Sequence, residues 1–114
     1  MEASRKAAIQ AYKERRTPRG IFAVRCGATG NVWVDSAMDL QAAKNRTLAG
    51  LRLGDAFMEK TIAEDYRAHG PDAFTFEILE TLSDDVPPVA LRDLLKERKL
   101  HWVAQLAARK LSPV

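Results

Sequence analysis

The sequence predicts an α+β fold in which helices flank a small three-stranded sheet. Three short segments rich in β-branched and aromatic residues, 20–25, 31–35 and 74–79, predict the strands. The segments between and after them carry apolar residues at three- and four-residue steps, which predicts helices. With 114 residues, the chain is long enough for one folded domain and too short for two.

The first two predicted strands are separated by a glycine-containing turn. Residues 27–30 read Gly-Ala-Thr-Gly, and glycine supplies the backbone freedom that a tight turn needs. The loop lacks the spacing of a phosphate-binding glycine-rich loop, and it joins two strands instead of opening a helix. We therefore expect an antiparallel hairpin here, with the third strand, 74–79, in the same sheet.

The helices are predicted from their capping residues and apolar faces. Ser36 or Asp39 can cap a helix that ends at Gly54, and Asp55 can cap a second helix that ends at a His-Gly-Pro segment. The final helix begins near two consecutive prolines and carries a leucine-rich stripe. An additional, weakly amphipathic N-terminal helix is expected over residues 4–16.

Positive charge is concentrated at the two ends of the chain. The formal net charge is +3, and counting Lys and Arg against Asp and Glu gives +4 for residues 1–19, −5 for 20–91 and +4 for 92–114. Basic patches attract phosphate backbones, although Lys and Arg also solvate ordinary helix surfaces. We divide the chain into a basic N-terminal helical extension, 1–18, and a folded domain, 19–110.

The composition excludes several classes of protein. No apolar run approaches the ~18–20 residues that a membrane-spanning helix needs, so no membrane partner is expected. The first residues lack the apolar segment of a secretory signal. Cys26 is the only cysteine, which excludes an internal disulfide and favours a cytoplasmic location. With two histidines and no paired-cysteine motif, we do not expect a zinc site.

Lys99 is the most informative residue of the final helix. It lies four residues after Leu95 and three before Trp102, which places a charge on the apolar stripe. Either its aliphatic stem passes along the apolar face so that the ammonium reaches water, or the helix opens onto a cleft at this point. The second interpretation places a functional site halfway along the helix.

The hairpin resembles the GIY-YIG nuclease module. The family's first signature, Gly-Ile-Tyr, corresponds to residues 20–22, which read Gly-Ile-Phe. Its second, Tyr-Ile/Val-Gly, corresponds to residues 33–35, which read Trp-Val-Asp. Residues 66–80 are similar to the family's helix, His-Gly and following strand, and residues 97–103 are similar to its last helix. Together these segments span residues 19–107.

The resemblance implies the family's α+β fold and its activity, the cleavage of DNA phosphodiester bonds with a divalent metal, Mg²⁺ or Mn²⁺. It places the two signature tyrosines on Phe22 and Trp33, and the metal-binding glutamate of the last helix on Lys99. The family's helix arginine corresponds by spacing to Ala43. Arg46, one turn later on a similar face, is therefore the candidate for that role.

These substitutions change the chemistry that the site can perform. Phe22 has no hydroxyl to accept or relay a proton, and Lys99 repels a cation where a carboxylate would bind it. Glu97 is a candidate metal ligand but lies about 200° round the helix from Lys99. Asp35, in place of the signature glycine, is a second candidate carboxylate. We therefore expect hydrolysis to be weak or lost.

Three functions remain open. The chain is an endonuclease that uses Trp33, Arg46 and a displaced carboxylate, or a DNA-binding relative with weak or lost catalysis, or a protein-interaction module for an acidic partner. The residue chemistry favours DNA binding through Lys44, Arg46, Arg98 and Lys99. In that case Lys99 is expected to point into the same cleft as Trp33 and Arg46.

Overall fold

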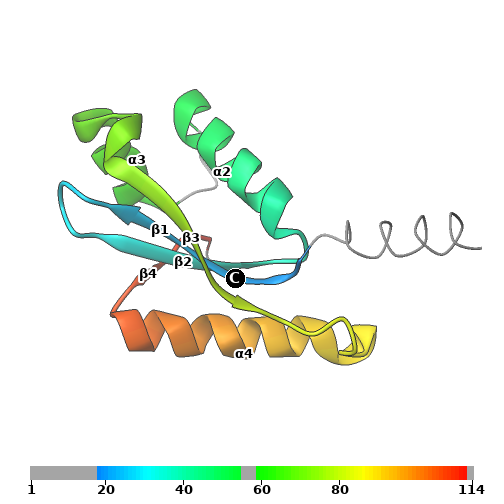
Figure 1. Ribbon diagram of the computed structural model, residues 1–114. Coiled ribbons are helices and arrows are strands. Elements are labelled where there is room, and N and C mark those ends of the chain that lie inside the picture. Colours follow the sequence, from blue (N-terminus) through cyan, green and yellow to red (C-terminus); the bar gives the residue numbers. More distant parts are fainter. Residues whose placement is uncertain (1–17, 55–58, 113–114) are drawn as a thin grey trace, which may run out of the picture.

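The structure, a computed structural model, describes residues 18–54 and 59–112, which form three layers (Figure 1). A sheet lies in the middle, helices α2 and α3 cover one face, and α4 covers the other. The predicted N-terminal helix and the Asp55 cap lie outside the described residues. In chain order the described elements are β1 (Gly20–Cys26), β2 (Val32–Ala37), α2 (Leu40–Leu53), α3 (Lys60–His69), the 3-10 helix η1 (Pro71–Ala73), β3 (Phe74–Thr81), α4 (Pro88–Leu106) and β4 (Arg109–Lys110).

The α+β class and the three predicted strands are confirmed, but the sheet has a fourth strand. Its order is β3-β1-β2-β4, with β1 antiparallel to β2 and β3, and β4 parallel to β2. The sequence did not indicate β4, because its two residues, Arg109 and Lys110, are charged and their pairing depends on the neighbouring strand. Gly20, at the start of β1, admits no side chain, since a Cβ there would collide with the carbonyl of Glu80 on β3.

The turns and caps of the hairpin region follow from local chemistry. Gly30, in the loop between β1 and β2, has φ +79°, the left-handed region that glycine adopts without strain. Asp39 caps α2, because the Ala42 amide donates a 2.8 Å hydrogen bond to its Oδ1. Of the two capping candidates, Ser36 and Asp39, the structure therefore selects Asp39.

Among the described residues, no helix is long and apolar enough to cross a membrane.

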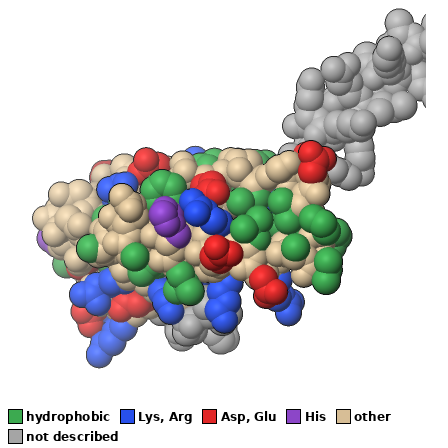
Figure 2. Space-filling view, turned by 90° about the horizontal axis from the view of Figure 1, so that it is seen from below, with side chains coloured by type: hydrophobic (Ala, Val, Ile, Leu, Met, Phe, Trp, Pro, Cys, Tyr) green, Lys and Arg blue, Asp and Glu red, His purple; other side chains and the backbone are tan. Residues whose placement is uncertain are grey.

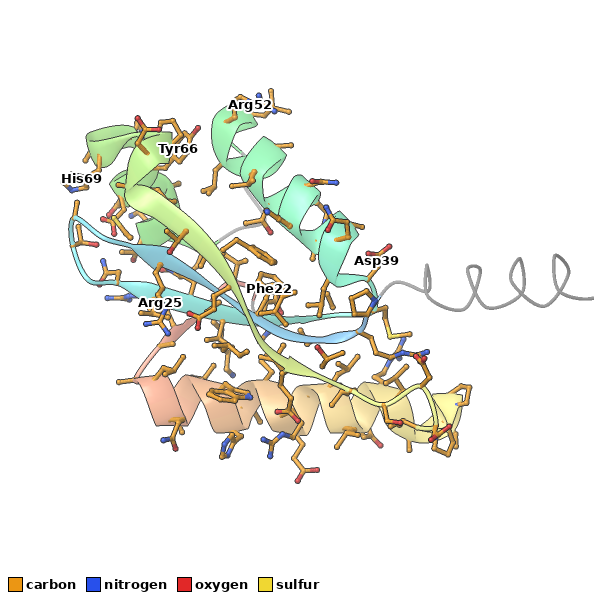
Figure 3. All side chains as sticks on the ribbon, viewed as in Figure 1. Phe22, Arg25, Asp39, Arg52, Tyr66 and His69 are labelled. Carbon is orange, nitrogen blue, oxygen red and sulfur yellow. The ribbon has the colours of Figure 1, made fainter. Side chains whose placement is uncertain are left out.

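Side chains of β1 and β2 alternate between the two faces of the sheet and build two hydrophobic clusters. Phe22 belongs to the cluster under α2 and α3, and its ring stacks on Phe76 at 4.8 Å between ring centroids (Figure 3). Ile21, its neighbour, belongs to the cluster under α4. This alternation directs Asp35, the register partner of Phe22 in β2, toward the α2 side of the sheet, where the site lies.

Candidate functional site

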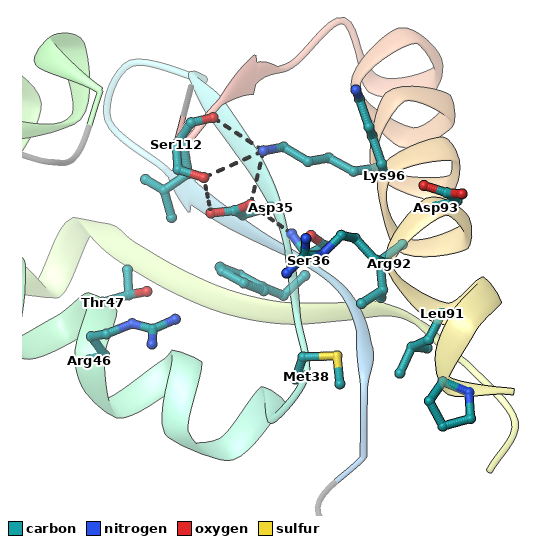
Figure 4. A pocket seen from close by; sticks show the side chains of 15 residues that line it. Asp35, Ser36, Met38, Arg46, Thr47, Leu91, Arg92, Asp93, Lys96 and Ser112 are labelled. Atoms are coloured by element: carbon teal, nitrogen blue, oxygen red, sulfur yellow. Dashed lines mark hydrogen bonds and ion pairs between the residues drawn. The ribbon is translucent and has the colours of Figure 1, made fainter. Parts of the chain in front are cut away.

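A cavity of about 840 Å³ lies between α2, the end of β2 and the first half of α4 (Figure 4). Apolar side chains, including Phe22, Leu95 and Leu111, form part of its wall. Its lining also contains six charged side chains: Asp35, Arg46, Arg92, Asp93, Lys96 and Lys99. A partly apolar cavity with a few converging charged groups has the composition of a ligand-binding site.

Lys99 and Asp35 form an ion pair in this cavity. The Lys99 side chain is only 2% exposed, and its Nζ lies 3.0 Å from Asp35 Oδ1. Nζ also donates to the Ser112 carbonyl at 3.1 Å and to Ser112 Oγ at 3.5 Å. The Ser112 hydroxyl in turn donates to Asp35 Oδ2 at 2.7 Å. The buried cation is therefore held by a network that joins β2, α4 and the segment after β4 (Figure 4).

The donor groups of this network do not fit a divalent metal. Hard cations such as Mg²⁺ take carboxylate, carbonyl and water oxygens. Oδ1 of Asp35 already accepts from the Ser36 amide at 2.8 Å and pairs with Lys99, and Oδ2 accepts from Ser112. A lysine ammonium occupies the place where a second carboxylate would be needed. Among the residues that the structure describes, no three His, Cys, Asp or Glu side chains gather as a metal site.

Three further cations border the cavity. Arg46 projects from α2, and Arg92 and Lys96 project from α4 (Figure 4). All three are exposed, and within the described part of the chain none forms an ion pair with a carboxylate within 4.0 Å. Their charges are therefore available to an anionic ligand.

The structure brings together some of the predicted site residues and separates others. Phe22, Asp35, Arg46 and Lys99 line the one cavity. The interpretation that the Lys99 ammonium escapes to water is wrong, because Lys99 is buried and paired. The interpretation that α4 opens onto a cleft at Lys99 is the one the structure supports.

The prediction that Trp33 shares this cleft is wrong. Trp33 is fully buried in the core and does not line the cavity. Its Nε1–H donates to Glu59 Oε2 at 2.7 Å, and the Thr61 hydroxyl donates to Glu59 Oε1. Burial alone would raise the pKa of Glu59, but these hydrogen bonds outweigh it and hold that pKa below its usual value. Trp33 thus acts as a core residue with a satisfied N–H.

Three other predicted residues also lie away from the cavity. Lys44 is exposed on α2, and Glu97 is exposed on α4, where it is remote from the Lys99 face, so neither lines the cavity. Arg98 instead pairs with Glu80 of β3, with Nε 2.8 Å from Oε1. The geometry therefore gives no support to Glu97 as a metal ligand, or to Lys44 and Arg98 as part of this site.

The pairing of Arg98 predicts a pH dependence. Burial would raise the pKa of Glu80, but hydrogen bonds from Trp102 and Arg98 together hold that pKa below its usual value of 4.5. A lowered carboxyl pKa stabilises the fold above the unfolded-state pKa, and this contribution is lost as the pH falls through the folded-state pKa. We expect Glu80→Gln to cost about 1 kcal/mol at pH 7 and much less at pH 3, as measured by thermal unfolding. An equal loss at both pH values would contradict this account.

Three residues of the site, Arg92, Lys96 and Ser112, were not predicted from the sequence. Arg92 and Lys96 precede Lys99 by seven and three residues, so they share its side of the helix, and this spacing was a usable signal. Ser112 gave no signal, because it reaches the site only through the return of the chain along β2 as β4.

The fold is similar to that of solved endonuclease domains. The catalytic domain of the homing endonuclease I-TevI aligns with a TM-score of 0.65 and 26% identity, over 78% of this chain and 88% of that one. A variant of the catalytic domain of the intron endonuclease I-TevI aligns with a TM-score of 0.68 and 23% identity, over 86% and 95%. No family model and no curated protein matches the sequence.

These neighbours define the class of the domain as nuclease-like in fold. The particular fold is that of the GIY-YIG nucleases, as the signature-like hairpin implied.

Proposed function

We propose that this chain binds DNA through its phosphate backbone at the cavity, and that metal-dependent phosphodiester hydrolysis is weak or lost. The observation that carries the proposal is the buried Lys99–Asp35 pair, with 3.0 Å between Nζ and Oδ1. It stands where the GIY-YIG resemblance implies a metal-binding glutamate. The endonuclease catalytic domains that share the fold support DNA as the partner.

The cations that border the cavity support phosphate binding. Arg46 on α2 and Arg92 on α4 come from opposite walls, so a phosphodiester between them can contact both. Arginine forms two parallel hydrogen bonds to phosphate oxygens, which fixes the position of the backbone. The outer face of α4 is a weaker candidate, because its Lys and Arg side chains are interspersed with Asp and Glu (Figure 2).

A salt titration of DNA binding tests the proposal. Affinity should fall steeply with salt, with a logarithmic slope near −0.9 for each phosphate contact. We expect Arg46→Ala and Arg92→Ala each to weaken binding at low salt by about three- to tenfold and to reduce the slope by ~1. Fluorescence anisotropy with a labelled duplex measures both quantities.

Lys44→Ala is the matched control, because Lys44 is also a cation of α2 but does not line the cavity. It should leave affinity and slope nearly unchanged. Equal losses in the Lys44 and Arg46 variants would contradict binding at the cavity, and no DNA binding at all would favour a protein partner instead. Plasmid nicking by the wild-type chain in Mg²⁺ or Mn²⁺, abolished by Arg46→Ala, would overturn the proposed loss of hydrolysis.

A further inference from the structure

We propose that the cavity takes the base of a single unpaired nucleotide of DNA, while the exposed cations around it hold the backbone phosphates of that nucleotide. The inference rests on the proposed function, because it names the form of DNA that the same site would bind. Two features of the cavity carry it: an apolar interior whose charges compensate each other, and a positively charged rim. Phosphate contacts alone would explain the rim but not the interior.

The interior of the cavity is mainly apolar. Phe22, Leu91 and Leu95 are buried side chains of the core, and all three line it. Lys99 and Asp35 also line it, but they form an ion pair with 3.0 Å between Nζ and Oδ1, so their charges compensate each other. An uncharged planar group therefore suits this interior better than a phosphate does, because burying an unpaired charge is costly.

The rim of the cavity carries the positive charge. Arg46 on α2 and Arg92 and Lys96 on α4 are exposed, and within the described part of the chain none of them forms an ion pair within 4.0 Å (Figure 4). Asp93 is exposed beside them, and three cations against one carboxylate leave the rim positive. Such a rim attracts an anionic backbone, and arginine forms paired hydrogen bonds to phosphate oxygens.

Met38 is an exposed apolar residue at the edge of the cavity (Figure 4). Its side chain lines the cavity although it is 60% exposed, and it lies in the short connection between β2 and α2. The sulfur of methionine is polarisable and makes favourable contacts with aromatic rings. A base that enters the cavity would pass along this side chain and remove part of it from water.

An unpaired nucleotide offers the combination of groups that this cavity fits. In a fully paired duplex the faces of the bases are stacked on each other, so phosphates, sugars and base edges face a protein. Taking a base out of the stack costs least where the base has no partner. Proteins that bind single strands likewise combine a positively charged groove with side chains on which bases stack. A volume of about 840 Å³ also lies in the range of pockets that enclose one small ligand.

Three labelled duplexes with the same flanking sequence test the inference. The first is fully paired, the second has a single bulged nucleotide, and the third has at the bulge a tetrahydrofuran spacer, which carries no base. Fluorescence anisotropy with the full chain in EDTA, at one salt concentration, measures the three affinities. We expect the duplex with the bulged nucleotide to bind at least tenfold more tightly than the other two, because it alone offers a free base.

Met38→Ala separates binding of the base from binding of the backbone. It should weaken binding of the bulged nucleotide by about three- to tenfold, because apolar contact area is lost, and should leave the fully paired duplex nearly unchanged. Arg46→Ala should instead weaken all three duplexes by a similar factor, since all three present phosphates. Leu48→Ala is the matched control, because Leu48 is an exposed apolar residue of α2 that does not line the cavity. Its three affinities should equal those of the wild type.

Three outcomes would overturn this inference alone. Equal affinities for the bulged and the fully paired duplex would show that no base is bound. Equal affinities for the bulge with and without its base would show that the protein recognises the bend of the backbone, and unchanged binding by Met38→Ala would place the base outside the cavity. If Met38→Ala does not fold, as judged by circular dichroism, the three affinities of the wild-type chain decide. Binding of none of the duplexes would contradict the proposed function as well.

Discussion

Lys99→Met is expected to lower the free energy of unfolding by about 3 kcal/mol. The substitution keeps an unbranched apolar stem of similar shape but removes the ammonium, so Asp35, whose side chain is 17% exposed, loses its buried cation. Removing one partner of a buried ion pair typically costs ~3–5 kcal/mol, since the other charge stays behind. Here the lower end applies, because Ser112 and the Ser36 amide still donate to the carboxylate. Urea unfolding followed by circular dichroism measures the loss.

Lys96→Met is the matched control for this experiment. Lys96 lies on the same helix and lines the same cavity but is exposed, so its replacement should change the stability by no more than ~0.5 kcal/mol. Adding Asp35→Asn to Lys99→Met should recover part of the loss, because the uncompensated charge is then gone. A loss below ~1 kcal/mol for Lys99→Met would show that the pair contributes little to the fold.

Lys99→Glu is expected to create a divalent-metal site. The substitution places a second carboxylate opposite Asp35, where the ammonium now lies 3.0 Å from Oδ1. Without metal, the two negative charges repel and the variant should be less stable than the wild type. With Mg²⁺ or Mn²⁺ in large excess over its dissociation constant, binding should restore ~2–3 kcal/mol, a rise of roughly 10 °C in Tm.

Calorimetry and thermal unfolding with and without EDTA check this expectation. Lys44→Glu is the control, since it makes the same change of charge on an exposed site outside the cavity and should gain no metal dependence. If the Tm of the Lys99→Glu variant does not change when metal is added, the proposed correspondence between Lys99 and the family's metal-binding glutamate is contradicted. DNA cleavage is not expected from this change alone, because Phe22 still lacks a hydroxyl, and the double change with Phe22→Tyr is the test for hydrolysis.

The motif positions predicted the fold correctly, but they did not predict the role of each side chain. Trp33 stands where the family has a catalytic tyrosine, yet its indole is buried and its N–H is satisfied by Glu59. Glu59 lies 26 residues after Trp33 in the sequence and follows a segment outside the described residues. The pattern of the strand that contains Trp33 therefore gave no indication of this hydrogen bond. A larger aromatic side chain whose N–H finds a partly buried acceptor is stabilised in the core instead of in the cleft.

Basic residues were the least predictable part of the site. Arg46, Lys44 and Arg98 look alike in the sequence, but only Arg46 lines the cavity. Arg98 pairs with Glu80, a partner from β3 that lies 18 residues earlier. Which cation remains available to a ligand depends on the carboxylates that the fold brings near it, and charge counts along the chain do not contain that information.

The sequence by itself determined the order of the main strands and helices from β1 to α4, the hairpin and the apolar stripe of α4, because these follow from turn residues and from periodicities of two and of about 3.6 residues. It also marked Lys99 as a charge on an apolar face. Only the tertiary structure decided what that charge does. Asp35 on β2 reaches Lys99 because the β1–β2 register directs its side chain toward the α2 side of the sheet. Ser112 reaches the same site because β4 returns the chain beside β2. A buried ammonium must find such partners to be compensated, and partners 64 and 13 residues away are chosen by the fold and not by local sequence.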